Sequence, residues 1–303
     1  MTIIDAHSHL WMKQDTIVNG KRILTLKNGR SIFMDEEVQM LPPFMTDGKN
    51  TAEVFLSNMD YAQVGAAVVV QEIIDGNQND YLREVQQRYP DRFFCMGAPA
   101  FTAQGTVQTA LTDTESAHSH GLRGMALPGH RLTTSLLELM PMFKLMERHG
   151  MALSMCLADD EKQIGEMREV IQECPKLKVA IGHFGMVTTP SFESQVLLAR
   201  EGKNVMIESG GITWLFHKEF YPYPSAIRSI RRASDLVGMD RLMWGSDYPR
   251  TITAITYKMS YDFVSKSADL TEDEKSLFLG ENAKRFYGFR HLPTLPYVKN
   301  MSE

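Results

Sequence analysis

The sequence predicts an α/β protein of the (β/α)8 TIM-barrel class, and three observations support this prediction. Short apolar runs rich in β-branched residues alternate with longer amphipathic stretches, as in the βαβ units that build a parallel sheet. Eight such runs within roughly 290 residues match the usual strand number and length of this barrel. A doubly wound sheet is the alternative, but no glycine-rich phosphate loop follows the first run.

Each expected strand is a short apolar run, such as GAAVVVQ at 65–71. The eight strands cover 2–7, 65–71, 92–99, 122–127, 151–157, 178–183, 204–209 and 241–247. Between most of them, apolar residues recur with the period of an amphipathic helix. The helices expected from this pattern cover 51–64, 79–90, 135–150, 161–174 and 224–238.

About 40 residues between His9 and the first helix interrupt the alternation of strands and helices. Asn-Gly pairs flank the run RILTL in this segment, which predicts a β-hairpin. Because the segment leaves the carboxyl end of the first strand, we expect residues 10–50 to overhang the functional face of the barrel as a lid. We expect residues 1–289 to form a single barrel domain and residues 290–303 a loosely packed tail.

Composition excludes several classes of function. The net charge is −5 and the chain has no basic block, so nucleic acid is not an expected partner. We find no apolar run long enough to span a membrane and no secretory signal at the N-terminus. The three cysteines are scattered, which favours reduced thiols in a cytoplasmic protein.

Three expected strands end in residues that bind metals or transfer protons. The first strand carries Asp5, His7 and then His9; because alternate residues share a face, we expect all three to face the barrel lumen. The sixth strand ends at His183, in register with Val179 and Ile181, and the eighth ends at Asp247. Imidazole and carboxylate groups that converge on one mouth can hold a divalent cation or act as general acids and bases.

These motifs resemble the amidohydrolase superfamily. DAHSH in the first strand, GHFG after the sixth, MWGSDYP at the eighth and GENAKRFYGF near the C-terminus carry the resemblance. They are most similar to the branch that holds aminocarboxymuconate-semialdehyde decarboxylase-like enzymes and the pyrone-dicarboxylate and sugar-acid lactonases. The resemblance covers residue 3 to about 289 and implies a barrel enzyme that acts on a small molecule.

The resemblance also implies roles for individual residues. His7 and His9 would be metal ligands, Asp247 both a ligand and the general base, and His183 a catalytic residue that binds or polarises the substrate. Metal-dependent members usually add a ligand from the fourth or fifth strand, but here the fifth strand ends in Met155 and Cys156. Related lactonases also lack this ligand and work without a metal, so one divalent ion, zinc or manganese, is expected only as an optional cofactor.

Further candidates follow other expected strands. His130 and Arg131 lie in the loop after the fourth strand, Trp214 lies after the seventh, and Arg250 follows Asp247. We expect these four residues to bind substrate, since arginine suits planar carboxylates. The fourth strand has Ala126 where a basic residue is common in the resembling lactonases, so their way of binding a carboxylate is not carried over in full.

The remaining histidines and cysteines receive no catalytic role. His118 and His120 precede the fourth strand and His149 ends a helix, which places them at the end of the barrel that serves stability. We expect His118 and His120 to be solvated surface residues. Cys156 has no neighbouring histidine in the sequence, and buried cysteines are usually inert.

Hydrolysis of a lactone or similar ester of a small carboxylated or sugar-derived substrate is the function expected first. Metal-dependent decarboxylation is the alternative, and a non-catalytic barrel that only binds a ligand is a third. The intact set of His7, His9, His183 and Asp247 favours an enzyme over the binding protein. Barrels of this group often associate, so a homo-oligomer is left open.

Overall fold

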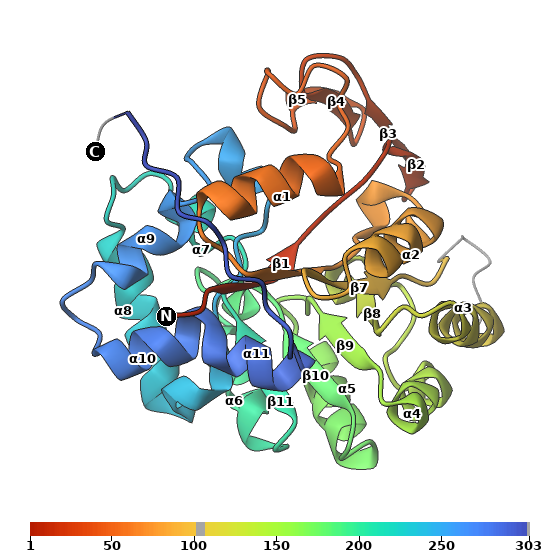
Figure 1. The fold of residues 1–303 in the computed structure, drawn as a ribbon. Helices are drawn as coiled ribbons and strands as arrows, with labels where there is room; N and C mark the ends of the chain where they lie inside the picture. The colour runs from red at the N-terminus through yellow and green to blue at the C-terminus, as the bar shows by residue number, and fades with distance from the viewer. Residues whose placement is uncertain (101–106, 302–303) are drawn as a thin grey trace.

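The structure, a computed structural model, describes residues 1–100 and 107–301, and in this part eight parallel strands form a barrel surrounded by helices (Figure 1). Neighbouring strands follow one another in chain order, which confirms the predicted fold class. The barrel strands are β1 (Ile4–Ser8), β6 (Ala66–Val69), β7 (Phe93–Gly97), β8 (Gly124–Leu127), β9 (Ala152–Met155), β10 (Lys178–Ile181), β11 (Val205–Glu208) and β12 (Leu242–Met243).

Several helices begin or end at a recognisable capping residue. Thr51 accepts a hydrogen bond from Val54 N at the start of α1, Asp160 accepts one from Lys162 N at the start of α5, and Gly150 ends α4 in the left-handed conformation. The described helices are α1 (Ala52–Tyr61), α2 (Asn79–Arg88), α3 (Val107–Ser119), α4 (Met140–His149), α5 (Glu161–Glu173), α6 (Phe192–Leu197), α7 (Ile212–Leu215), α8 (Pro224–Val237), α9 (Met259–Ser265), α10 (Glu272–Ser276) and α11 (Asn282–Tyr287). The five helices expected from periodicity are all present.

The barrel closes between its first and last strands without a regular ladder. The chain beyond β12 runs beside β1 and is joined to it by backbone bonds: Ala6 N donates to Trp244 O at 2.9 Å and Asp247 N donates to His7 O at 2.9 Å. An isolated parallel bridge joins Ser8 and Tyr248. This seam therefore places Asp247 directly beside the two histidines of β1.

The strand residues divide into two apolar layers. From every barrel strand, alternate residues face the lumen, as Ile4, Phe94, Ala180 and Met243 do. These lumenal side chains pack together with Phe286 of α11 at the amino ends of the strands. The intervening residues pack outward under the helices in the main core. The lumen is thus filled by side chains, and the carboxyl ends of the strands form the mouth where active sites of this fold lie.

The expectation that Asp5 faces the lumen is wrong. Ile4 and Ala6 are the inward residues of β1, and an irregularity in the pairing of β1 with β6 falls between Asp5 and Ser8. Because an extra residue reverses the alternation, His7 turns into the barrel while Asp5 stays outside it. Asp5 accepts hydrogen bonds there from Ser246 N at 2.8 Å and the Tyr257 hydroxyl at 2.7 Å.

The same correction applies to β10. Val179 and Ile181 pack in the outer core, and Ala180 faces the lumen. His183 reaches the mouth because the chain leaves the strand after Ile181 and turns through a short 3-10 segment, η3 (His183–Gly185). The direction of the His183 side chain is therefore set by the turn at the end of β10 and not by the alternation of residues along the strand.

The segment expected as a hairpin is a four-stranded antiparallel sheet. Its strands are β2 (Asp15–Val18), β3 (Lys21–Thr25), β4 (Arg30–Phe33) and β5 (Glu36–Gln39), paired in chain order. Turns at Asn19-Gly20 and Asn28-Gly29 have positive φ, as the Asn-Gly signal predicts. Figure 1 shows this sheet as a separate lobe beside the barrel.

The chain ends in a helix that covers the barrel and a segment without regular structure. Ala283 and Tyr287 of α11 pack against the lumenal side chains at the amino ends of the strands. From Arg290 the described tail is extended and runs past α1 (Figure 1), where Gln63 donates a hydrogen bond to Pro296 O at 3.3 Å. Residues 302–303 of the expected tail lie outside the described residues. No helix in the described ranges is both long and apolar enough to cross a bilayer.

Candidate active site

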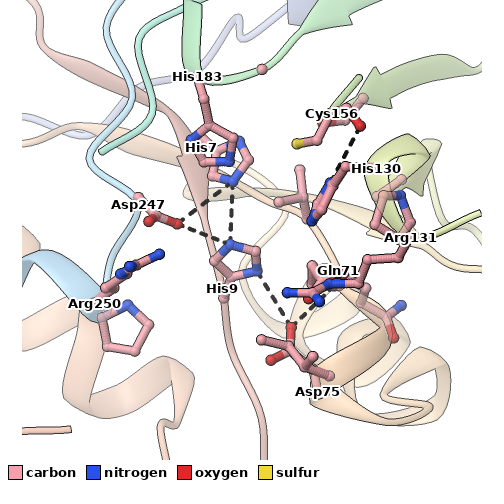
Figure 2. Close-up of a pocket in the computed structure, with 18 of the residues that line it drawn as sticks. His7, His9, Gln71, Asp75, His130, Arg131, Cys156, His183, Asp247 and Arg250 are labelled. Atoms are coloured by element: carbon pink, nitrogen blue, oxygen red, sulfur yellow. Dashed lines mark hydrogen bonds and ion pairs between the residues drawn. The ribbon is translucent and has the colours of Figure 1, made fainter. Parts of the chain in front are cut away.

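The open end of the barrel holds a cavity of about 650 Å³. His7 reaches it from β1, His9 from just after that strand, His183 from η3, and Asp247 from the segment after β12. Figure 2 shows the four side chains converging on one region of the cavity. The structure therefore brings together the four residues that the strand-end pattern singles out.

His7, His9 and Asp247 form a compact group of potential metal ligands. The Nε2 atoms of the two histidines are 3.2 Å apart, and Asp247 Oδ1 lies 3.2 Å from His9 Nε2 and 3.8 Å from His7 Nε2. Atoms bound about 2.0–2.1 Å from a tetrahedral zinc ion are roughly 3.3 Å apart. The three atoms thus have the chemistry and the spacing that a single divalent ion requires.

Each histidine of this group has a carboxylate behind its other ring nitrogen. Glu208, the last residue of β11, lies with Oε1 2.8 Å from His7 Nδ1, and Asp75 Oδ2 lies 3.4 Å from His9 Nδ1. Such partners set the tautomer and orientation of ligand histidines. Burial disfavours charge on His9, but its contacts with Asp247 and Asp75 outweigh burial and raise its pKa to about 10. The carboxylates around the two histidines therefore favour positive charge at this group of residues.

Asp75 lines the cavity beside His9 and was missed by the sequence patterns. It ends the short 3-10 segment η1 (Ile73–Asp75), a few residues beyond β6, and is buried. Gln14 of the inserted segment donates a hydrogen bond to its Oδ1 at 3.0 Å. Asp75 lies beyond Gln71, where the second expected strand ends, so a pattern of polar residues at strand ends does not include it.

Asp247 is held in its ionised form. Burial opposes its charge, yet the hydrogen bond with His9 and the nearby imidazoles hold its pKa well below the usual range of a carboxyl group. Its Oδ2 accepts a hydrogen bond from Trp214 Nε1 at 2.6 Å. Asp247 and His183 have positive φ values of 56° and 57°, an uncommon conformation outside glycine that tends to occur at functional sites.

His183 lies next to the group, with its ring centroid 4.6 Å from that of His7. Its Nδ1 is 2.6 Å from the carbonyl oxygen of Gly210, and a carbonyl can only accept, so Nδ1 carries the proton. Burial and the neighbouring His7 lower the pKa of His183. The neutral ring therefore presents the lone pair of Nε2, which can accept a proton or bind a cation.

The cationic residues expected to bind substrate all line the same cavity. Arg131 Nε donates to Glu72 Oε1 at 2.9 Å, so its charge is already partnered. Arg250 has no carboxylate within ion-pair distance among the described residues, and its guanidinium carbon lies 3.7 Å from the centre of the Trp214 ring. Desolvation and the Arg131 charge lower the pKa of His130 to about 4. Arg250 is thus the cation with most capacity for a substrate anion.

Cys156 and residues of the inserted segment form further parts of the cavity wall. Cys156 lines the cavity, but burial and the surrounding carboxylates raise the pKa of its thiol well above the usual value, so it does not supply a thiolate. Phe33, Val38 and Met40 of the inserted segment also line the cavity. The excursion therefore lies over the site, as its origin at the end of β1 predicts.

A glycine leaves room for the carboxylate behind His7. A Cβ added at Gly245 would lie 2.7 Å from Glu208 Oε2 and 2.7 Å from His7 Cβ. We expect Gly245→Ala to displace His7, to lower the free energy of unfolding by about 1–3 kcal/mol, and to abolish most turnover. Denaturant unfolding and steady-state kinetics measure the two effects.

Gly165→Ala is the matched control for this substitution. Gly165 lies inside α5, and an added Cβ would meet nothing within 4 Å. This change should leave turnover unaltered and raise the free energy of unfolding by about 0.5–1 kcal/mol. Equal behaviour of the two variants would contradict the packing argument at Gly245.

His118, His120 and His149 lie away from this cavity. His120 is exposed and bonds to Ser116 O at 2.7 Å, as expected for a surface residue. His118 and His149 are half-buried instead, with their rings stacked 3.9 Å apart. The expectation that His118 is a solvated surface residue is therefore wrong.

Comparison with known proteins supports this assignment of the fold. The chain resembles the "probable 2-pyrone-4,6-dicarboxylic acid hydrolase" of Acinetobacter baumannii, whose structure holds citric acid, with a TM-score of 0.69 and 20% identity over 95% of this chain and 100% of the other. It also resembles an amidohydrolase of Burkholderia multivorans with bound zinc, with a TM-score of 0.67 and 15% identity over 97% and 100% of the two chains.

A decarboxylase shares the fold as well. The 5-carboxyvanillate decarboxylase of Sphingomonas paucimobilis superposes with a TM-score of 0.59 and 17% identity over 79% of this chain and 84% of the other. No curated protein sequence matches the chain. The family model described as "Amidohydrolase" matches residues 4–289. The chain therefore belongs to the amidohydrolase family and is an enzyme of that superfamily.

Proposed function

We propose that this enzyme hydrolyses a lactone or similar ester of a small carboxylated or sugar-derived compound. The observation that carries the proposal is that an ionised carboxylate, Asp247, and a guanidinium without a carboxylate partner among the described residues, Arg250, open onto one cavity. A base beside an anion-binding group suits the attack of water on an ester that bears a carboxylate.

The side chains suggest how the reaction proceeds. Asp247, whose two carboxylate oxygens also contact His9 Nε2 and Trp214 Nε1, takes a proton from water, and the water oxygen bonds to the carbonyl carbon. The positive charge of His9, whose pKa the neighbouring carboxylates raise to about 10, stabilises the resulting oxyanion. The bond between the carbonyl carbon and the ring oxygen then breaks, and Asp247 returns its proton to that oxygen. The products are a hydroxyl group and a carboxylic acid, which releases its proton to water to become a carboxylate.

We propose further that His7, His9 and Asp247 hold one divalent ion, zinc or manganese. When bound, such an ion supplies Lewis-acid activation and lowers the pKa of water. We expect gently purified protein to contain about one ion per chain, and His7→Ala combined with His9→Ala to lose it. Elemental analysis and a chelation series measure this, with the exposed His120→Ala as the control. Full activity of ion-free protein in chelator would contradict the requirement for a metal.

Arg250→Gln tests the proposed anion-binding residue. Loss of a charged hydrogen-bond partner costs about 1.5–3 kcal/mol, so we expect KM for a carboxylated lactone to rise by roughly 10- to 150-fold while kcat changes little. The exposed Arg228, which bonds to Ser225 Oγ, gives the control Arg228→Gln. An unchanged KM in Arg250→Gln would show that the substrate carboxylate binds elsewhere.

Decarboxylation is the second candidate, because the spacing of His7, His9 and Asp247 also suits a metal-dependent decarboxylase. A screen of carboxylated lactones and aromatic acids in ¹⁸O-labelled water separates the two reactions. Hydrolysis places one ¹⁸O in the product carboxylate and releases no carbon dioxide. Release of carbon dioxide without incorporation of ¹⁸O would overturn the hydrolase proposal in favour of the decarboxylase.

A further inference from the structure

A second cavity, of about 300 Å³, lies at the opposite end of the barrel. Arg123 precedes β8, and Lys178 is the first residue of β10, whereas His183 follows the end of that strand. With a rise of about 3.3 Å per residue, the two cavities are separated by roughly the length of the barrel. The side chains that define the second cavity are Phe94, His118, Arg123, His149, Lys178 and Tyr287.

Two basic side chains, Arg123 and Lys178, line this cavity without a carboxylate partner among the described residues. Arg123 Nη2 donates to Tyr287 O at 2.9 Å, and Lys178 Nζ donates to Phe286 O at 2.7 Å. Neither lies within ion-pair distance of an acidic group in the described residues. Their guanidinium and ammonium groups are near enough that the Arg123 charge, after burial, contributes to a lowered pKa of Lys178.

The hydrogen bonds to the last carbonyls of α11 account for only part of the donor capacity of Arg123 and Lys178. Cations near the C-terminal end of a helix satisfy its last carbonyls and its dipole, and each residue uses one N–H in this way. An arginine has five N–H donors and a lysine three, so most of their donors have no protein partner among the described residues. Two half-buried cations with spare donors favour an anionic ligand.

The rest of the lining supports the same conclusion. The Tyr287 ring is part of the lining and is almost fully buried, so it contributes an apolar surface and its hydroxyl is not open to a ligand. His118 and His149 stack beside it, and His149 Nε2 pairs with Glu115 Oε2 at 3.0 Å. Glu115 is 57% exposed and is not part of the lining.

We propose that this cavity is a second binding site for a small dianion, either a phosphate-bearing compound or a dicarboxylate. Arg123 and Lys178 provide both the charge and the free hydrogen-bond donors. Phe94, whose ring lies 4.2 Å from the Arg123 guanidinium carbon, and the stacked histidines give flat walls for the remainder of the ligand. The site shares no residue with the catalytic cavity.

Calorimetric titration with inorganic phosphate, and separately with succinate, tests the proposal. We expect one of the two probes to bind wild-type protein, and Arg123→Gln/Lys178→Gln to weaken that binding by about tenfold or more. Arg241, at the same end of the barrel, donates to backbone carbonyls, pairs with Asp240 at 3.9 Å and is outside the cavity, so Arg241→Gln should bind normally. Failure of both probes to bind wild-type protein would overturn the proposal.

Tyr287→Phe is a second control. Because its hydroxyl is buried and has no hydrogen-bond partner among the described atoms, this change should leave stability unchanged or slightly increased and should leave binding of the probe unchanged. Circular dichroism and turnover show whether the Arg123→Gln/Lys178→Gln variant is folded, and undiminished binding in that variant would exclude the site itself.

Chemical modification of histidines locates the bound probe. Phosphate or succinate should protect His118 and His149 from diethyl pyrocarbonate, as measured by mass spectrometry of the peptides, but should not protect the neighbouring exposed His120. Protection confined to His130, at the catalytic mouth, together with loss of binding in Arg250→Gln, would show that the anion binds only at the catalytic cavity.

Discussion

Asp247→Asn should lower kcat by about 10³-fold or more and leave the fold intact. The amide cannot accept a proton from water, and general-base catalysis contributes roughly 10²–10⁴-fold. Asparagine can still accept the Trp214 hydrogen bond that the aspartate accepts at 2.6 Å, so the surrounding structure should persist. Single-turnover kinetics and circular dichroism measure the two effects.

Asp159→Asn is the matched control. Asp159 lines the same cavity and accepts a hydrogen bond from Ser191 N at 3.0 Å, but it has no contact with the histidines. We expect its turnover to stay close to that of the wild type. Wild-type turnover in Asp247→Asn would remove Asp247 from the role of base, and an equal loss in both variants would indicate a general effect of charge in the cavity.

Glu208→Gln should have the second-largest effect, through His7. Glu208 Oε1 accepts from His7 Nδ1 at 2.8 Å and from His183 N at 3.2 Å, while Oε2 accepts from Gly210 N. A glutamine must turn its NH₂ group toward one of these donors. We expect metal affinity or kcat/KM to fall by about 10- to 100-fold and the free energy of unfolding to fall by about 1–3 kcal/mol.

Glu166→Gln separates the loss of function from the loss of stability. Glu166 is also largely buried and accepts a hydrogen bond from a backbone N–H, Leu136 N, at 2.9 Å, but it is remote from the histidines. Its variant should be destabilised and yet retain metal and turnover. If Glu208→Gln lost stability alone, with unchanged metal affinity and kinetics, Glu208 would not act as a positioning residue for His7.

Much of the site was predictable because strand ends are local features. In a parallel barrel all the carboxyl ends meet at one mouth, so His7, His9, His183 and Asp247 could be grouped without coordinates. The directions of these side chains and the contacts between them could not be predicted from strand-end positions. The irregularity between Asp5 and Ser8 reverses the alternation of β1, and no local pattern in DAHSH shows it.

The residues behind the histidines depended on long-range packing. Glu208 is 201 positions from His7, and Asp75 reaches His9 only because η1 folds back over the mouth. The inserted segment was recognisable from its Asn-Gly turns, but its second pair of strands, β4 and β5, has weaker local signals. The pairing of His118 with His149 joins two helix ends that periodicity alone does not place together.

The sequence by itself determined the barrel, its strand order and the identity of the groups at its mouth, because hydrophobic period and strand-end position are properties of short segments. The tertiary structure alone decided which face Asp5 and His7 take, which carboxylates orient the histidines, and that Arg123 and Lys178 share a cavity. These depend on the packing of residues distant in the chain, which no local pattern encodes.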